Sequence, residues 1–142
     1  ADVLARRGLV HAWVVRGADG LDEITTTTTT SVVEVRDGAI VDRFEVSPDQ
    51  AGLDRSSLDD LAVGDAAANA AAAESLLAGE SGPVRDTVVL NAGAGLVVAG
   101  VADDLTDGVD RAATAIDEGL ATRTLSELVA VSRAVRDAAS DD

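Results

Sequence analysis

A short apolar run near the N-terminus, Val10–Val15 (VHAWVV), constrains the fold more than any other stretch of this chain. A nearly continuous apolar run is typical of a strand that is covered on both faces, as in a parallel sheet. The preceding segment, Val3–Gly8, has arginines followed by glycine, which is typical of the last turns of a helix. A helix followed by a buried strand predicts an α/β domain, with the neighbouring strands either supplied elsewhere or absent.

The residues after this strand predict a β-hairpin. Six consecutive threonines, Thr25–Thr30, have branched side chains that suit a strand, and they lead into an apolar stretch that contains Asp37 and Gly38. Asp-Gly between two apolar runs is a strong signal for a type I′ turn, which would pair Val35 with Ile40. We therefore interpret the threonines as the approach to a hairpin and not as disorder.

Helices are expected beyond Pro48, so that residues 1–47 hold the strand, the turn and the hairpin, and residues 48–142 are mainly helical. Asp65 can cap an alanine-rich helix that stops at Gly79. Pro83 can begin one long helix, although the TVVL within it would also suit a strand. Two further helices are indicated by apolar residues at helical spacing: Val109, Ala112, Ala113, Ile116 and Leu120, then Leu125, Leu128, Val129 and Val135. Residues 137–142 are expected to form a frayed tail.

The composition excludes several classes of function. The chain has 26 acidic residues against 11 basic ones and a net charge of -15, which repels a phosphate backbone, so no nucleic-acid partner is expected. It has no cysteine and one histidine, His11, so the metal to expect is a hard, oxygen-bound cation such as Mg²⁺. Neither a membrane span nor a signal peptide is visible, which predicts a cytoplasmic protein without a membrane partner. The chain begins with Ala1 rather than methionine, which indicates a fragment of a longer polypeptide.

A glycine-rich turn with two adjacent acids, Asp22 and Glu23, follows the apolar strand. In open α/β sheets, ligands bind outside the carboxyl ends of the strands, where residues 17–23 would lie. Glycines there allow a ligand to approach closely, and neighbouring carboxylates offer the oxygen ligands that Mg²⁺ takes together with substrate phosphate and water. The pattern alone is also compatible with a turn whose acids are merely exposed to solvent.

Three separated motifs, in this order and at this spacing, resemble one enzyme family. They are AWVVRGADGLDEITTTTT, GDAAANAAA and GPVRDTVVLNAGAGLVVAG. Through them, Val3–Val131 is similar to the C-terminal part of the anthranilate phosphoribosyltransferases. Members of that family have a small helical domain and a larger α/β domain. They transfer the phosphoribosyl group of phosphoribosyl pyrophosphate to the amine of anthranilate in tryptophan biosynthesis, releasing diphosphate. The resemblance implies part of a parallel-sheet phosphoribosyltransferase domain, with a β-hairpin followed by a helical C-terminal half.

By this resemblance, Asp22 and Glu23 match the acidic pair that holds Mg²⁺ at the diphosphate. The family's phosphate loop (GTGGD), its helical domain and most of its anthranilate contacts would precede this segment and are expected to be absent from it. We therefore assign no catalytic residue here and expect the isolated chain to be inactive. It would associate with the remainder of the enzyme or form a homodimer. The alternative is a non-catalytic homologous domain or accessory fragment that packs against a partner chain.

Arg16 departs from the family pattern, because the family commonly has histidine at this position. As a permanent cation beside the acidic turn, Arg16 has three possible roles: it pairs with Asp22, it touches phosphate, or it is a surface residue without a role. His11, inside the apolar strand, is interpreted as a partly buried spacer rather than an acid or base.

The remaining polar residues have structural interpretations. Asp65 and Asn69 lie one helical turn apart and are explained by capping and local hydrogen bonding. Asn91 would be a polar residue on a largely apolar helix and is expected to make a structural hydrogen bond. The alanines and glycines of the helical half indicate close packing of helices.

Overall fold

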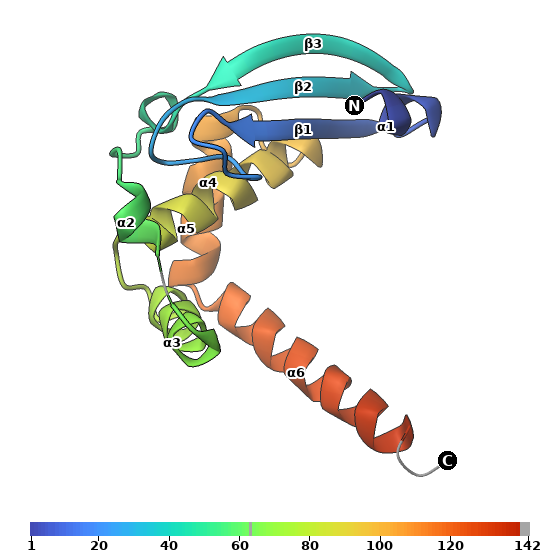
Figure 1. The fold of residues 1–142 in the computed structure, drawn as a ribbon. Helices are drawn as coiled ribbons and strands as arrows, with labels where there is room; N and C mark the ends of the chain where they lie inside the picture. The colour runs from blue at the N-terminus through green and yellow to red at the C-terminus, as the bar shows by residue number, and fades with distance from the viewer. Residues whose placement is uncertain (63, 140–142) are drawn as a thin grey trace.

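The computed structural model describes residues 1–62 and 64–139 of the chain. Its elements (Figure 1) are, in order, α1 (Asp2–Arg6), β1 (His11–Gly17), β2 (Thr30–Arg36), β3 (Ala39–Val46), the short 3-10 helix η1 (Pro48–Ala51), α2 (Leu58–Leu61), α3 (Ala66–Leu77), α4 (Pro83–Val98), α5 (Leu105–Asp117) and α6 (Leu120–Ala139). The expected α/β class, with a hairpin followed by a helical C-terminal half, is confirmed.

The three strands form one antiparallel sheet in the order β1-β2-β3. β1 pairs with β2 from His11 opposite Arg36 to Gly17 opposite Thr30. This pairing differs from the parallel one expected from the apolar run Val10–Val15, because no helical crossover follows β1 and the connection simply turns the chain back. Within the described residues β1 is an edge strand, and its side chains from His11 to Val15 are only partly buried.

The hairpin between β2 and β3 is confirmed in its predicted register. Val35 pairs with Ile40, and Asp37 and Gly38 have φ angles of 46° and 75°. Positive φ at both central residues is what a type I′ turn requires. β2 begins only at Thr30, so most of the threonine run lies in the loop before the strand.

The helical layer lies against one face of the sheet, with α4 and α5 below the strands in Figure 1. One continuous core joins the layers, and its most deeply buried members include Ile24, Val32, Val89, Leu90, Val109 and Ile116. The long helix expected from Pro83 is confirmed as α4, so its TVVL segment is helical. The Asp65 cap is also confirmed, since its side chain accepts a 2.9 Å hydrogen bond from the Ala68 N–H, and Gly79 follows the end of α3 with a φ of 93°.

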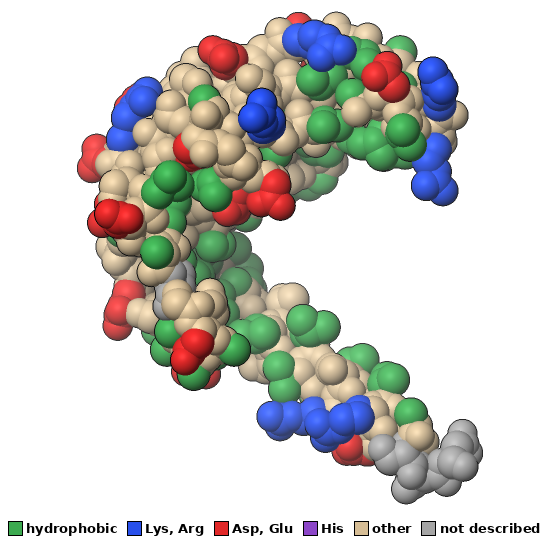
Figure 2. Space-filling view, in the orientation of Figure 1, with side chains coloured by type: hydrophobic (Ala, Val, Ile, Leu, Met, Phe, Trp, Pro, Cys, Tyr) green, Lys and Arg blue, Asp and Glu red, His purple; other side chains and the backbone are tan. Residues whose placement is uncertain are grey.

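The last helix, α6, leaves the body of the molecule as a rod that carries hydrophobic side chains along its length (Figure 2). Leu128, Val131 and Val135 are 63–64% exposed. Leu120 begins α6 instead of ending α5. Residues 137–139 continue α6, so the expectation of a frayed tail is wrong for these three residues. Residues 140–142 lie outside the described part of the chain. Among the described helices, none has the length and apolar character needed to cross a membrane.

Candidate functional site

The turn beyond β1 closes tightly on itself. The Gly17 N–H donates to the Leu21 carbonyl at 2.9 Å, and the Gly20 N–H donates to the Gly17 carbonyl at 3.0 Å. Both glycines are needed, because Gly20 has a φ of +99° and a Cβ on Gly17 would collide with Oδ1 of Asp19. The sequence thus builds a compact turn directly beyond the carboxyl end of a strand.

Asp22 and Glu23, the predicted metal ligands, follow this turn and are exposed. Their carboxylates make no hydrogen bond or ion pair within the described part of the chain. Across residues 1–62 and 64–139, no group of three or more His, Cys, Asp or Glu side chains could hold a metal by itself. Two free, adjacent carboxylates fit Mg²⁺, which commonly takes one or two protein carboxylates and completes its shell with substrate phosphate and water.

Asp19 organises the turn from within. Its Oδ2 accepts hydrogen bonds from the hydroxyls of Thr25 at 2.7 Å and Thr27 at 2.5 Å, and its Oδ1 accepts from the Leu21 N–H at 3.0 Å. Burial alone would raise the pKa of Asp19, but the hydrogen bonds from Thr27, Thr25 and Leu21 outweigh it and hold the pKa below its usual value of 3.8. Asp19 is therefore an anion that ties the acidic turn to the threonine loop.

The threonine loop is held by its hydroxyl groups. Thr25, Thr26 and Thr30 are completely buried. The Thr25 N–H donates to the Thr30 hydroxyl at 3.0 Å, and the Thr26 hydroxyl lies 2.9 Å from that of Thr87 in α4 and 2.7 Å from that of Ser56. Threonine supplies both a hydroxyl and a branched apolar surface, so the loop can be buried with its polar atoms satisfied. The run does carry the chain from the turn to the hairpin, as expected, but as a hydrogen-bonded loop.

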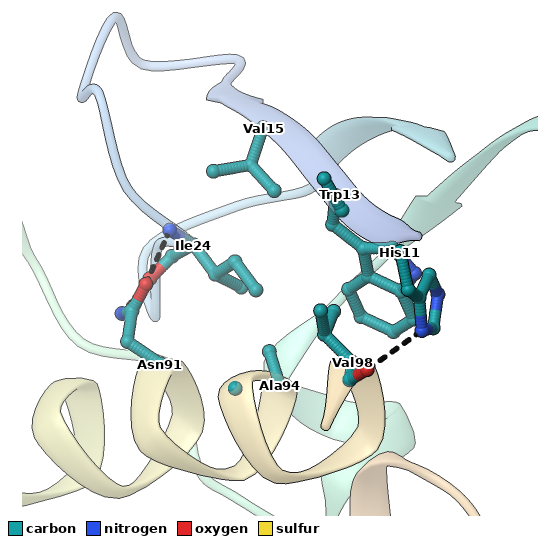
Figure 3. A pocket seen from close by; sticks show the side chains of 9 residues that line it. His11, Trp13, Val15, Ile24, Asn91, Ala94 and Val98 are labelled. Atoms are coloured by element: carbon teal, nitrogen blue, oxygen red, sulfur yellow. Dashed lines mark hydrogen bonds between the residues drawn. The ribbon is translucent and has the colours of Figure 1, made fainter. Parts of the chain in front are cut away.

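Asn91 reaches the same segment from α4. Its amide oxygen accepts from the Ile24 N–H at 2.9 Å (Figure 3). Its amide nitrogen donates to the Ile24 carbonyl at 2.8 Å. The structural hydrogen bond expected of Asn91 is therefore confirmed. Its partner is the backbone of the residue that directly follows Glu23.

The other polar residues fall outside the turn. Arg16 is exposed at the end of β1 and has no ion pair within the described residues, so the pairing with Asp22 is not observed. Asn69 donates to the carbonyls of Gly64 and Asp65, as expected from local bonding.

His11 is partly buried, as expected, and links two elements. Nδ1 lies 2.7 Å from the Val98 carbonyl at the end of α4, and Nε2 lies 2.8 Å from Oε1 of Glu34 in β2. The same carboxylate oxygen accepts from Trp13 and Arg36. Burial favours a raised pKa for Glu34, but the hydrogen bonds from Arg36, His11 and Trp13 lower it below its usual value of 4.5.

A hollow of about 320 Å³ opens between β1 and α4, beside the turn. It is largely apolar and is lined by His11, Trp13, Val15, Ile24, Ala94 and Val98, among others (Figure 3). It therefore lies beneath the face of β1 that carries His11, Trp13 and Val15, at the edge strand of the described sheet.

The sequence interpretation missed two anchoring residues, Asp19 and Glu34. Asp19 carried a usable signal, because an aspartate beside a glycine in a turn often accepts from the backbone N–H two residues on, as it does from Leu21. The signal for Glu34 was weaker, because its position opposite Trp13 depends on the pairing of β1 with β2, which was not predicted.

Comparison with known proteins identifies a family and several similar sequences. Residues 1–122 match the model of the glycosyl transferase family, a/b domain. The anthranilate phosphoribosyltransferase of Rhodospirillum rubrum is 52% identical over 92% of this chain, and that of Methylorubrum populi is 53% identical over 93%. The chain spans 38% and 39% of the lengths of these two relatives.

Solved structures show the same likeness. The crystal structure of anthranilate phosphoribosyltransferase from Thermus thermophilus superposes with a TM-score of 0.75 at 38% identity, covering 84% of this chain and 35% of that one. The Saccharomyces cerevisiae enzyme in complex with phosphoribosyl pyrophosphate and Mg has a TM-score of 0.72 at 23% identity. The superposition covers 80% of this chain and 33% of the yeast chain, and it shows that the two share a fold. Because the family model covers residues 1–122 of the 142, this chain belongs to the glycosyl transferase family, within its a/b domain.

Proposed function

We propose that this chain is a segment of an anthranilate phosphoribosyltransferase and that Asp22 and Glu23 hold the Mg²⁺ at the diphosphate of phosphoribosyl pyrophosphate. The observation that carries the proposal is the pair of exposed carboxylates, free of any partner in the described chain, just beyond the end of β1. Relatives that are 52% and 53% identical over nearly the whole of this chain bear this enzyme name. In the yeast protein of the same fold, phosphoribosyl pyrophosphate and Mg are bound together.

The residues of the turn have separable tasks. Asp22 and Glu23 present oxygen ligands, while Asp19 accepts hydrogen bonds from two hydroxyls and a backbone N–H and so serves to hold the turn to the threonine loop. When bound, Mg²⁺ would stabilise the negative charge that develops on the leaving diphosphate. Gly20 is exposed and has no side chain, which would let a diphosphate approach the backbone of the turn.

The partner of this segment is the remainder of the enzyme. The edge of β1, which pairs with no strand in the described part of the chain, and the apolar hollow beneath β1 are surfaces that proteins normally cover. Further strands of a parallel sheet, supplied with the phosphate loop and the helical domain, would cover both, and a homodimer would form through that helical domain. Without them, the carboxylates cannot position both reactants, so the isolated segment is inactive. The complete enzyme would act in tryptophan biosynthesis in the cytoplasm.

The test replaces both acids by amides, D22N/E23Q, in the complete polypeptide that the gene encodes. Because this change keeps size and removes two charges, kcat/KM for phosphoribosyl pyrophosphate should fall by about a hundredfold, or roughly 3 kcal/mol. Stability should change by no more than about 0.5 kcal/mol, as for exposed residues. The rate is measured across a Mg²⁺ titration, and the variant should lose the Mg²⁺ dependence seen in the wild type.

A matched control is D110N/E118Q. These two acids are also exposed, lie on and just beyond α5, and have no side-chain partner in the described chain. This control removes the same charge and should leave turnover unchanged. Unchanged turnover and Mg²⁺ dependence in D22N/E23Q would refute the metal assignment. A complete polypeptide without any transferase activity would favour the accessory-domain alternative.

A further inference from the structure

Asn91 holds the backbone at Ile24 through both of its polar groups. The side-chain oxygen accepts from the Ile24 N–H, and the side-chain nitrogen donates to the Ile24 carbonyl at 2.8 Å and to the Thr87 carbonyl at 2.9 Å. The reverse orientation of the amide would set its NH₂ against an N–H and its oxygen against two carbonyls, so the orientation is determined by the partners. One side chain thus joins α4 to a loop residue that is 67 positions away.

Asp22 and Glu23 lie between two anchored residues. Leu21, on one side, is held by the Gly17 N–H at its carbonyl and by Asp19 at its N–H. Ile24, on the other side, is held by Asn91 and is only 2% exposed. Since the two carboxylates have no partners of their own in the described chain, their placement depends on these backbone anchors.

Ile24 is held by core packing as well as by Asn91, and the hollow leaves its packing incomplete on the β1 side. Ile24 and Asn91 both line the hollow between β1 and α4, so this side of the junction is open (Figure 3). The hydrogen bonds of Asn91 therefore add a direct polar link between α4 and the residue next to Glu23, beside the core packing of Ile24 and the Thr26–Thr87 hydrogen bond. Removing them would loosen the Ile24 backbone while most of the core contacts of α4 remain.

We infer that Asn91 is a positioning residue that preorganises Asp22 and Glu23 for a divalent cation and diphosphate, an inference that rests on the function proposed above. A preformed pair binds without a further ordering cost, and a small displacement of a positioned group can reduce a rate severely. Asn91 itself touches neither cation nor substrate.

The test compares N91L, N91D and the control N69L in the complete polypeptide. Leucine is close to asparagine in size and removes every hydrogen bond, whereas aspartate keeps an acceptor for the Ile24 N–H and loses the donors. Asn69, the other asparagine, bonds only within its own helix start. Mn²⁺ with inorganic diphosphate is the probe, free Mn²⁺ is counted by electron paramagnetic resonance, and the site is defined as the binding that D22N/E23Q abolishes.

We expect N91L to weaken this Mn²⁺ binding by about tenfold, with a matching rise in the Mg²⁺ concentration needed for half-maximal turnover. N91D places its second oxygen against the Ile24 and Thr87 carbonyls and should also weaken binding, and N69L should leave it unchanged. A merely structural role would lower the unfolding midpoint of N91L and leave Mn²⁺ affinity unchanged in the folded protein, which would overturn the inference. Should N91L fail to fold, N91D carries the same comparison. If the wild type does not bind Mn²⁺ at Asp22 and Glu23, the metal assignment and this inference are both refuted. If the wild type and the Asn91 variants bind Mn²⁺ equally well, only the inference about Asn91 is refuted.

Discussion

Gly93 of α4 and Gly108 of α5 are in direct backbone contact where the two helices cross. A Cβ on Gly93 would lie 2.7 Å from the Val109 nitrogen, and a Cβ on Gly108 would collide with the Gly93 carbonyl. Both glycines are buried. This close approach fixes α4 against α5 and thereby the helix that carries Asn91 and Thr87 to the threonine loop.

The first prediction follows from this contact. G93A should lower the free energy of unfolding by about 3 kcal/mol, because a methyl group there meets rigid backbone instead of a flexible side chain. The matched control is G95A in the same helix, where a Cβ would have no neighbour within 4 Å. G95A should be neutral or stabilise the chain by up to about 1 kcal/mol. Urea unfolding of both variants separates them, and equal effects would contradict a tight helix crossing.

Local signals were enough to predict much of the fold. The type I′ turn at Asp37-Gly38 fixes the pairing of Val35 with Ile40, and Asp65 and Pro83 mark helix starts, because turn and cap chemistry depends on neighbouring residues only. The antiparallel pairing of β1 with β2 was not predictable in this way, because an apolar run reports burial and not the direction of its partner strand.

The second prediction concerns the pH dependence of stability at Glu34. E34Q should lose about 1–2 kcal/mol at neutral pH, since a charged acceptor of three hydrogen bonds becomes neutral. The pKa of Glu34 is lowered in the folded state. The stabilisation is therefore present above the ordinary value of 4.5 and is lost as the pH falls through the lower, folded value.

Unfolding of wild type and E34Q is measured between about pH 6 and pH 3. The difference between them should be largest at the upper end and shrink toward the acid end. E45Q is the control, because Glu45 is an exposed acid of β3 whose side chain has no partner in the described chain. A difference that stays constant with pH would refute the role of the Glu34 charge.

The third prediction concerns the threonine loop. T27V removes the 2.5 Å hydrogen bond to Asp19 while keeping the shape of the side chain, and should lower the free energy of unfolding by about 1–2 kcal/mol. T28V is the matched control, because Thr28 is in the same run but its hydroxyl has no partner in the described chain, and it should stay within about 0.5 kcal/mol. A double-mutant cycle of D19A with T27V should show coupling. Additive effects would mean that the Asp19 bond contributes nothing specific.

The metal role of Asp22 and Glu23 stays a prediction, and the long-range partners that support their turn could not be predicted. The two acids stand out in a glycine turn, but the pattern alone is compatible with exposed acids, and the metal role was implied by the family resemblance. Asn91 lies 67 residues from its partner Ile24, and Thr87 lies 61 residues from Thr26. Contacts of such separation depend on how α4 packs against the loop, which the spacing of residues within either segment does not encode.

The fourth prediction concerns Arg16, which is exposed at the end of β1 and pairs with no acid in the described chain. If this free cation contacts a phosphate of phosphoribosyl pyrophosphate, R16Q should raise KM for that substrate by about tenfold, or roughly 1.4 kcal/mol, with little change in kcat. The wild-type KM should also rise with salt, because ions screen an exposed charge pair, and R16Q should lose most of that dependence.

R43Q is the control, because Arg43 is an exposed arginine of β3 whose side chain has no partner in the described chain. Steady-state kinetics of the complete polypeptide at several salt concentrations distinguish the cases, and an R16Q variant with the KM and salt response of R43Q would identify Arg16 as a surface residue without a role in binding.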